Sequence, residues 1–182
     1  MKRTEMINKI KDWAGPIGPF VTIDTFEDFV NLNNERYSTI EESSIDVLFD
    51  ILLNPPKDED IKPIPFDEFT GELVDAITFV GKKDTKKFLL KLKEMLHFSK
   101  SRALIIDVIG GLEDIDGIEL LKPLLLEENL SDDEIIALVD ALSQIGGVES
   151  KEILENLKIK YENSREVLEE IDICLKLLNH SS

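Results

Sequence analysis

The chain has 182 residues, of which 38 are acidic and 21 are Lys or Arg, so its formal net charge is −17. Hydrophobic residues make up 42% of the chain, which is enough to build a core and argues against an acidic disordered protein. A single cysteine excludes a disulfide framework, no apolar run is long enough to span a membrane, and no secretory signal pattern is found. We therefore expect a cytoplasmic protein with no membrane contact. The negative charge also argues against nucleic acid as a partner, because phosphates need a positive face.

Residues 1–53 have the pattern of an irregular helical cap. Apolar residues at helical spacing predict a short helix over 3–13, which the Gly/Pro-rich stretch 15–19 ends. Thr25 lies three residues before an acidic residue, as in a capping box, and predicts the start of a second helix. A firmer apolar pattern over 45–52 predicts a third helix.

Residues 54–66 have the composition of an exposed loop. They contain four of the seven prolines and a run of charged residues from Lys57 to Asp60. Proline cannot continue a helix, so no long element is expected here. A loop of this length is either functional or a linker. We expect a linker that joins the cap to the segment that follows, and a functional role stays open.

Residues 67–182 repeat themselves with a period close to 32 residues. Four similar blocks each contain an aspartate, and these aspartates are 32, 33 and 32 residues apart. Glycines follow the first three blocks, and a second apolar segment follows each glycine. Each unit therefore predicts a helix, a tight turn and another helix. We expect one continuous domain of about three and a half such units.

The third unit carries the clearest local signals. Ser131 and Glu134 have the spacing of a capping box, and residues 135–145 follow a helical apolar period. Gly146 stands where a left-handed residue commonly ends a helix. In the preceding unit, Pro123 predicts either a kink in the second helix or a later start of that helix.

The sequences VDALSQIGG at 139–147 and SKEILENL at 150–157 resemble the short HEAT-like repeats of phycobilisome-lyase-like proteins. The resemblance covers about residues 67–179, without the family's usual Asp-Pro turn and following arginine. It implies a right-handed α-solenoid of helical hairpins whose second helices line a concave, ligand-facing surface. We thus predict an all-α protein, a solenoid of HEAT-like hairpins with an irregular helical N-terminal cap.

The sequence shows no catalytic or metal-binding motif. His97 and His180 lack any metal-ligand spacing, and a HEAT-like di-iron hydroxylase would need His-Glu pairs. Cys174 stands between apolar residues, which predicts a small buried hydrophobe. Asp114–Gly117 resembles part of a calcium loop, but the first and twelfth loop positions are not carboxylates. We predict that the protein is not an enzyme and has no catalytic residue, no metal and no cofactor.

Two charge features point to protein partners, and the first is acidic. We call the four block aspartates the aspartate ladder: Asp75, Asp107, Asp140 and Asp172. Stacked on successive repeats they would form an acidic stripe along the concave face, thickened by Glu72 and Glu169. The alternative to a binding role is that these are ordinary surface positions, because exposed helix positions are often acidic in an acidic protein. Aspartate is unfavourable inside helices, however, so its recurrence favours a binding role.

The second feature is a basic segment at residues 82–102. It holds eight basic and two acidic residues, a net charge of +6, which leaves −23 for the rest of the chain. An acidic partner, docking to a neighbouring acidic segment and plain solubility are the three interpretations. The predicted secondary basic patch consists of Lys82, Lys83, Lys86, Lys87, Lys91 and Lys93.

Together these features predict a non-catalytic protein–protein interaction module that binds a basic partner through an acidic concave surface. An immunity protein that inhibits a bacterial toxin and an adaptor subunit of a larger complex fit equally well. A HEAT-fold bilin lyase-like or DNA glycosylase-like enzyme is a disfavoured alternative, and a glycosylase would need a basic groove. In a structural alternative, the basic segment of one copy packs on the acidic face of another, and the oligomeric state stays open.

Overall fold

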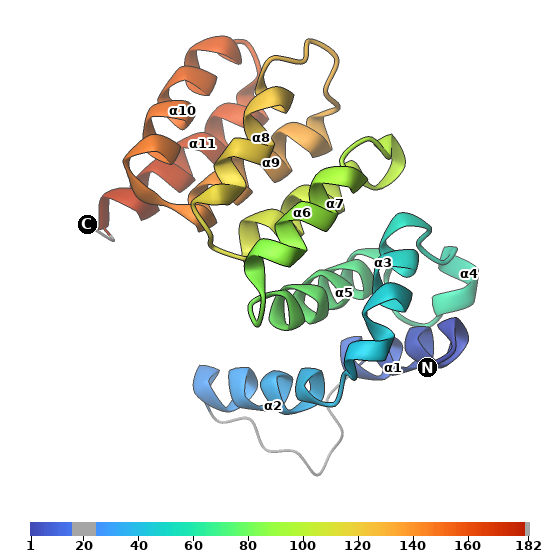
Figure 1. Ribbon diagram of the computed structural model, residues 1–182. Coiled ribbons are helices and arrows are strands. Elements are labelled where there is room, and N and C mark those ends of the chain that lie inside the picture. The colour runs from blue at the N-terminus through green and yellow to red at the C-terminus, as the bar shows by residue number, and fades with distance from the viewer. Residues whose placement is uncertain (16–24, 181–182) are drawn as a thin grey trace. The chain divides into compact units, whose positions relative to one another are not determined.

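The computed structural model describes residues 1–15 and 25–180, and within them the chain forms eleven α-helices, two short 3-10 helices and no strand (Figure 1). The predicted all-α class is thereby confirmed. Among these residues no helix has both the length and the apolar character needed to cross a bilayer. The helices form two compact units, Met1–Lys83 and Asp84–Ser182, which we call the N-terminal and C-terminal units. This boundary groups the first predicted repeat helix with the cap.

The N-terminal unit is built around its longest helix, α5. Its elements are α1 (Arg3–Ala14), α2 (Phe26–Ser38), a 3-10 helix (Glu42–Ser44), α3 (Ile45–Leu53), α4 (Asp58–Ile61) and α5 (Phe66–Gly81). Helix α5 packs against α1, α2 and α3, and buries Phe69, Leu73 and Ile77 completely. The Thr25 hydroxyl accepts from the Asp28 amide and caps α2, so the helices predicted for the cap are confirmed, together with this capping box. The predicted end of the first helix at 15–19 lies mostly outside the described residues.

Three aromatic side chains join α1, α2 and α5. The rings of Trp13 and Tyr37 meet edge to face with centroids 5.6 Å apart, and Phe79 lies 5.5 Å from Tyr37. The Lys9 ammonium lies 5.2 Å from the Trp13 ring centre, within the range of a cation–π contact. Trp13 is the only tryptophan of the chain. The contacts among these three aromatic rings therefore stabilise the packing of α1, α2 and α5 in the N-terminal unit.

Residues 54–66 differ from the exposed loop predicted for them. They contain the single turn of α4 (Asp58–Ile61), which packs on α1 and α5. Ile61 is fully buried and Ile64 nearly so, while the charged residues of the segment stay exposed. The prediction gave weight to the prolines and overlooked Ile61 and Ile64. Burial of these two side chains holds the segment against the N-terminal unit.

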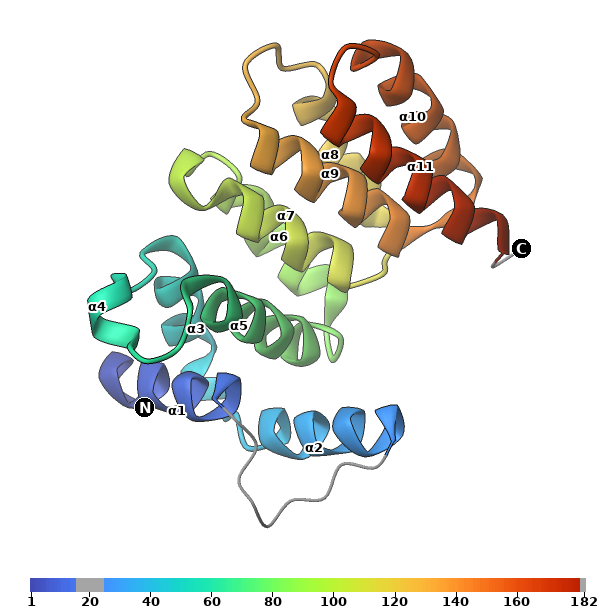
Figure 2. The same ribbon diagram turned by 180° about the vertical axis from the view of Figure 1, so that it is seen from behind.

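The C-terminal unit consists of two layers of helices. Its elements are α6 (Thr85–Met95), a 3-10 helix (Ser99–Ser101), α7 (Arg102–Gly111), α8 (Asp116–Leu125), α9 (Asp132–Ile145), α10 (Gly147–Lys160) and α11 (Arg165–His180). Helices α7, α9 and α11 lie side by side in one layer, with α9 in the middle (Figure 2). Helices α6, α8 and α10 form the other layer (Figure 1). Between the layers lies a core that includes Ile118, Val139 and Ile171.

Local signals place the ends of these helices. The Ser131 hydroxyl accepts from the Glu134 amide at 3.3 Å, and the Glu134 carboxylate accepts from the Ser131 amide at 2.8 Å, which confirms the predicted capping box. Pro123 lies in the last turn of α8, two residues before its end, so the predicted late start of this helix is wrong. Proline has no amide hydrogen, so Pro123 cannot bond to the Glu119 carbonyl one turn earlier.

Two successive glycines turn the chain directly from α9 into α10. Gly146 has φ 73° and ψ −165°, and Gly147 has φ 84°. The positive φ of Gly146 agrees with the predicted left-handed position, but its ψ does not. The pair of angles lies in a region that essentially only glycine enters, whereas asparagine tolerates the ordinary left-handed position.

We therefore expect Gly146→Ala and Gly146→Asn to destabilise the protein equally, by about 1 to 2 kcal/mol. Urea unfolding followed by circular dichroism measures both. A substantially smaller loss for Gly146→Asn would indicate an ordinary left-handed cap and contradict the backbone geometry described here.

Candidate functional site

Acidic side chains from three neighbouring helices meet on the layer formed by α7, α9 and α11. We call Asp107 of α7, Asp140 of α9 and Glu170 of α11 the acidic cluster. The Cys174 thiol points into it and lies 3.7 Å from Asp140 Oδ1 and 3.9 Å from Glu170 Oε1. The Cys174 Sγ and one carboxylate oxygen each of Asp140 and Glu170 all lie within 4.8 Å of one another.

The repeat explains why the aspartates of α7 and α9 come together. Asp107 and Asp140 occupy equivalent positions of successive repeats, and α7 packs directly on α9. Gly110 brings the two helices especially close, since a Cβ built on it would lie 2.5 Å from the Ala141 Cα. The absent side chain of Gly110 thus allows two helices that both carry an acid to approach each other.

This packing raises the pKa values of Asp107, Asp140 and Cys174. Burial, helped by the negative charge of Asp140, raises the pKa of Asp107 to about 6. Burial and the negative charge of Glu170 raise the pKa of Asp140 to about 6 as well. Burial also raises the pKa of the Cys174 thiol to about 11, so it stays protonated at neutral pH.

The cluster has no basic partner among residues 1–15 and 25–180, because none of its three carboxylates forms an ion pair there. Six other acids among the described residues of this unit do form ion pairs. The ion pairs of the unit include Arg102 with Glu127 and Glu134, Lys122 with Glu119 and Glu149, Lys158 with Asp172, and Arg165 with Glu169. The fold therefore leaves its most crowded carboxylates without a counter-charge.

The structure separates the members of the predicted acidic stripe. Asp172 pairs with Lys158 of α10, and Glu169 pairs with Arg165 one turn earlier. In α11 it is Glu170 that joins the cluster. Residues two positions apart on a helix point about 200° away from each other, so Asp172 and Glu170 face different neighbours.

Sequence analysis missed Glu170 and the polar role of Cys174. A signal existed, because residues four apart share a helix face and Cys174 follows Glu170 by four. The cysteine is buried, as predicted for a small hydrophobe, but its thiol contacts carboxylates.

Asp75 and Glu72 belong to the N-terminal unit, where both lie on α5. Burial raises the pKa of Glu72, and the pKa of the Tyr37 phenol is raised by burial and by the Glu72 charge. Asp75 is exposed to solvent. Nearby protein atoms still remove part of the water around its carboxyl group, which raises the pKa of Asp75 as well. These two residues of the predicted acidic stripe therefore belong to a different unit from the acidic cluster.

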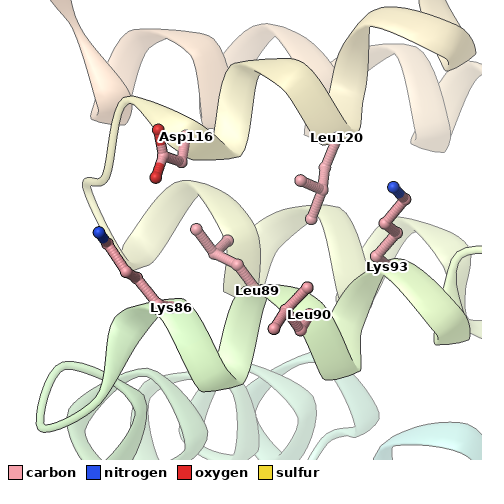
Figure 3. A pocket seen from close by; sticks show the side chains of 6 residues that line it. All are labelled: Lys86, Leu89, Leu90, Lys93, Asp116 and Leu120. Carbon is pink, nitrogen blue, oxygen red and sulfur yellow. The ribbon is translucent and has the colours of Figure 1, made fainter.

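A second feature is a groove between α6 and α8, on the other layer of the C-terminal unit. We call it the leucine groove, and it has a volume of about 290 Å³. It is lined by Lys86, Leu89, Leu90, Lys93, Asp116 and Leu120 (Figure 3). Two residues of the predicted basic patch, Lys86 and Lys93, thus flank an apolar floor.

The other lysines of that patch do not line the groove. Lys87 and Lys91 lie on α6 outside its lining, whereas Lys82 and Lys83 end the N-terminal unit. The Lys83 ammonium lies 5.4 Å from the centre of the Phe79 ring. The patch is therefore divided between the two units.

The acidic cluster can attract a cation or a basic side chain. Asp140, Glu170 and Cys174 are the residues that could hold a metal ion, but the thiol would first have to lose its proton. A lysine or arginine needs no such step, because it forms hydrogen bonds directly to carboxylates.

No family model, curated protein or solved structure matches this chain. The resemblance to HEAT-like repeats therefore stays a prediction from the sequence.

Proposed function

We propose that the chain is a non-catalytic protein-interaction module of the cytoplasm that binds a basic protein partner through the acidic cluster. The observation that carries the proposal is that Asp107, Asp140 and Glu170, which lie on adjacent helices of one layer, form no ion pair within the described residues. By contrast, Glu169 and Asp172 of α11 both pair with a basic side chain. Half-buried carboxylates that repel one another cost stability. Such a cost is typical of binding sites, where a partner supplies the missing charge.

The proposed architecture is a right-handed α-solenoid of the HEAT-like hairpins α6–α7, α8–α9 and α10–α11, whose second helices α7, α9 and α11 form the ligand-facing layer. Each hairpin then begins one helix later than the unit predicted from the sequence. The sequence period and the side-by-side order of these three helices support it. In this arrangement equivalent positions of successive repeats line one surface, which suits an extended partner segment.

The raised pKa values of Asp107 and Asp140 give the proposed binding a recognisable signature. A lysine or arginine placed between them would favour their charged forms and lower both pKa values from about 6. Protons would therefore be released on binding near pH 6. The acidic surface would also speed association with basic partners at low salt.

An inhibitor of a basic toxin, such as an immunity protein, and an adaptor in a larger complex would both use the cluster in this way. The two roles differ in the activity of the partner, but in both the partner binds to the same acidic surface. The same variants therefore test the binding surface for either role.

The test compares two double variants that remove equal charge. Asp107→Asn with Asp140→Asn removes charge from the cluster, while Glu152→Gln with Glu155→Gln removes it from exposed positions of α10. We expect oligolysine to bind the cluster variant about tenfold more weakly than the wild type, and the α10 variant almost unchanged. Titration calorimetry in buffers of different ionisation enthalpy at pH 6 should show proton release for the wild type and the α10 variant only.

Equal weakening of both variants would show that binding follows net charge alone and would refute the cluster as the site. The same pair of variants applies to a basic protein that co-purifies with the chain from its host. Such a partner should be lost from the cluster variant and retained by the α10 variant.

A further inference from the structure

The leucine groove combines an apolar floor with lysine side chains. Leu89 is almost fully buried and forms the base, while Leu90 stands at the mouth with 68% of its surface exposed. Leu120 of α8 points toward them from the opposite wall (Figure 3). Leu90 therefore extends the apolar lining of the groove to its mouth, where an apolar ligand can contact it.

Neither lysine of the groove, Lys86 or Lys93, forms an ion pair with a carboxylate of the described ranges 1–15 and 25–180, although the chain as a whole carries −17. Lys122 and Lys158 of the same unit do form ion pairs with carboxylates. Two unpaired cations flanking an apolar floor match a ligand that is itself apolar and negatively charged.

The two ends of the groove differ in charge. Asp116 and Lys86 lie at one end, so their charges offset each other, and Lys93 lies at the other end (Figure 3). A negative head group would therefore be repelled least and attracted most at Lys93. The aliphatic part would run along the leucines toward Lys86.

We propose that the leucine groove binds the anion of an aliphatic monocarboxylic acid, with its carboxylate on Lys93 and its alkyl chain over Leu89, Leu90 and Leu120. Lys86 and Lys93 are seven residues apart on α6, so the groove is roughly 10 Å long, which suits a chain of about eight to ten carbons. The volume of about 290 Å³ lies at the small end of ligand pockets and agrees with a ligand of this size. Leu90 covers the bound chain from the side of the solvent.

This site is independent of the acidic cluster, because it lies on α6 and α8 and uses charges of the opposite sign. The test therefore uses decanoate as the probe and the full chain as the protein. Titration followed by amide chemical shifts should locate decanoate at α6 and α8, with saturable changes. Decyltrimethylammonium, which has the same tail and a positive head, should bind at least about tenfold more weakly, and butyrate should not bind detectably.

Variants decide where the head group lies. We expect Lys93→Glu to weaken decanoate binding by about tenfold or more and Lys93→Gln by less, while Lys86→Glu has a smaller effect. Lys176→Glu on α11, another exposed lysine, is the matched control and should bind like the wild type. Circular dichroism checks that each variant keeps its helical content.

The proposal is overturned if decanoate and decyltrimethylammonium bind equally, or if Lys93→Glu and Lys176→Glu have the same effect. It is overturned as well if decanoate shifts amides elsewhere, or if it does not bind and the groove takes only an acidic amphipathic peptide.

Discussion

Replacing Gly110 by alanine should destabilise the C-terminal unit by about 2 kcal/mol or more, although alanine is the better helix former. The new Cβ would lie 2.5 Å from the Ala141 Cα and 2.8 Å from its Cβ, so α7 and α9 would have to move apart. Helix propensity favours alanine over glycine by about 1 kcal/mol. Overpacking against backbone that cannot yield costs about 1 to 3 kcal/mol or more, and this larger effect wins.

Gly71→Ala is the control for this prediction. Gly71 lies inside α5, and no atom lies within 4 Å of the Cβ that alanine would add. We expect this substitution to stabilise its helix by about 0.5 to 1 kcal/mol. Denaturant unfolding by circular dichroism measures both changes. A Gly110→Ala protein as stable as the wild type would mean that α7 and α9 pack less closely than described.

Replacing Asp107 and Asp140 by asparagine should make the protein more stable at neutral pH. Both carboxyl groups have a folded-state pKa of about 6, which is above the value of about 3.9 expected in the unfolded chain. The folded state therefore binds their protons more tightly, so wild-type stability falls as pH rises through this interval and levels off above about pH 7. After allowance for solvent screening, we expect each substitution to gain about 1 kcal/mol at pH 7.5.

The pH dependence distinguishes this effect from a general loss of negative charge. The gap in melting temperature between the double variant and the wild type should be widest at pH 7.5 and should close as the pH approaches 4. Glu152→Gln with Glu155→Gln should track the wild type over the whole range. A gap that does not change with pH would show that Asp107 and Asp140 titrate normally in the folded state.

Sequence periodicity was sufficient to predict the longer helices and the equivalence of Asp107 with Asp140, but not the single turn of α4. These features depend on contacts within one helix or on a regular repeat, both of which a single sequence displays. The capping box at Ser131 is an example, since all of its atoms come from four consecutive residues.

The composition of the candidate sites depends on contacts that the sequence does not display. Asp172 matched the repeat position, yet its partner is Lys158, and Glu170 entered the cluster in its place. The rotation of α11 about its own axis decides which acid faces α9 and which faces α10, and the sequence does not display this rotation. Likewise, the lysines of 82–102 looked equivalent, but only the packing of α6 on α8 distinguishes Lys86 and Lys93 from the others.

The position of Trp13 gives the N-terminal unit an optical signal of its own. As the only tryptophan, it lies in the N-terminal unit against Tyr37, whereas both candidate sites belong to the C-terminal unit. Tryptophan fluorescence thus follows the melting of one unit, while far-ultraviolet circular dichroism sums over the helices of both. Agreement between the two signals would mean cooperative unfolding of the whole chain, and a displaced fluorescence transition would measure the autonomy of the N-terminal unit directly.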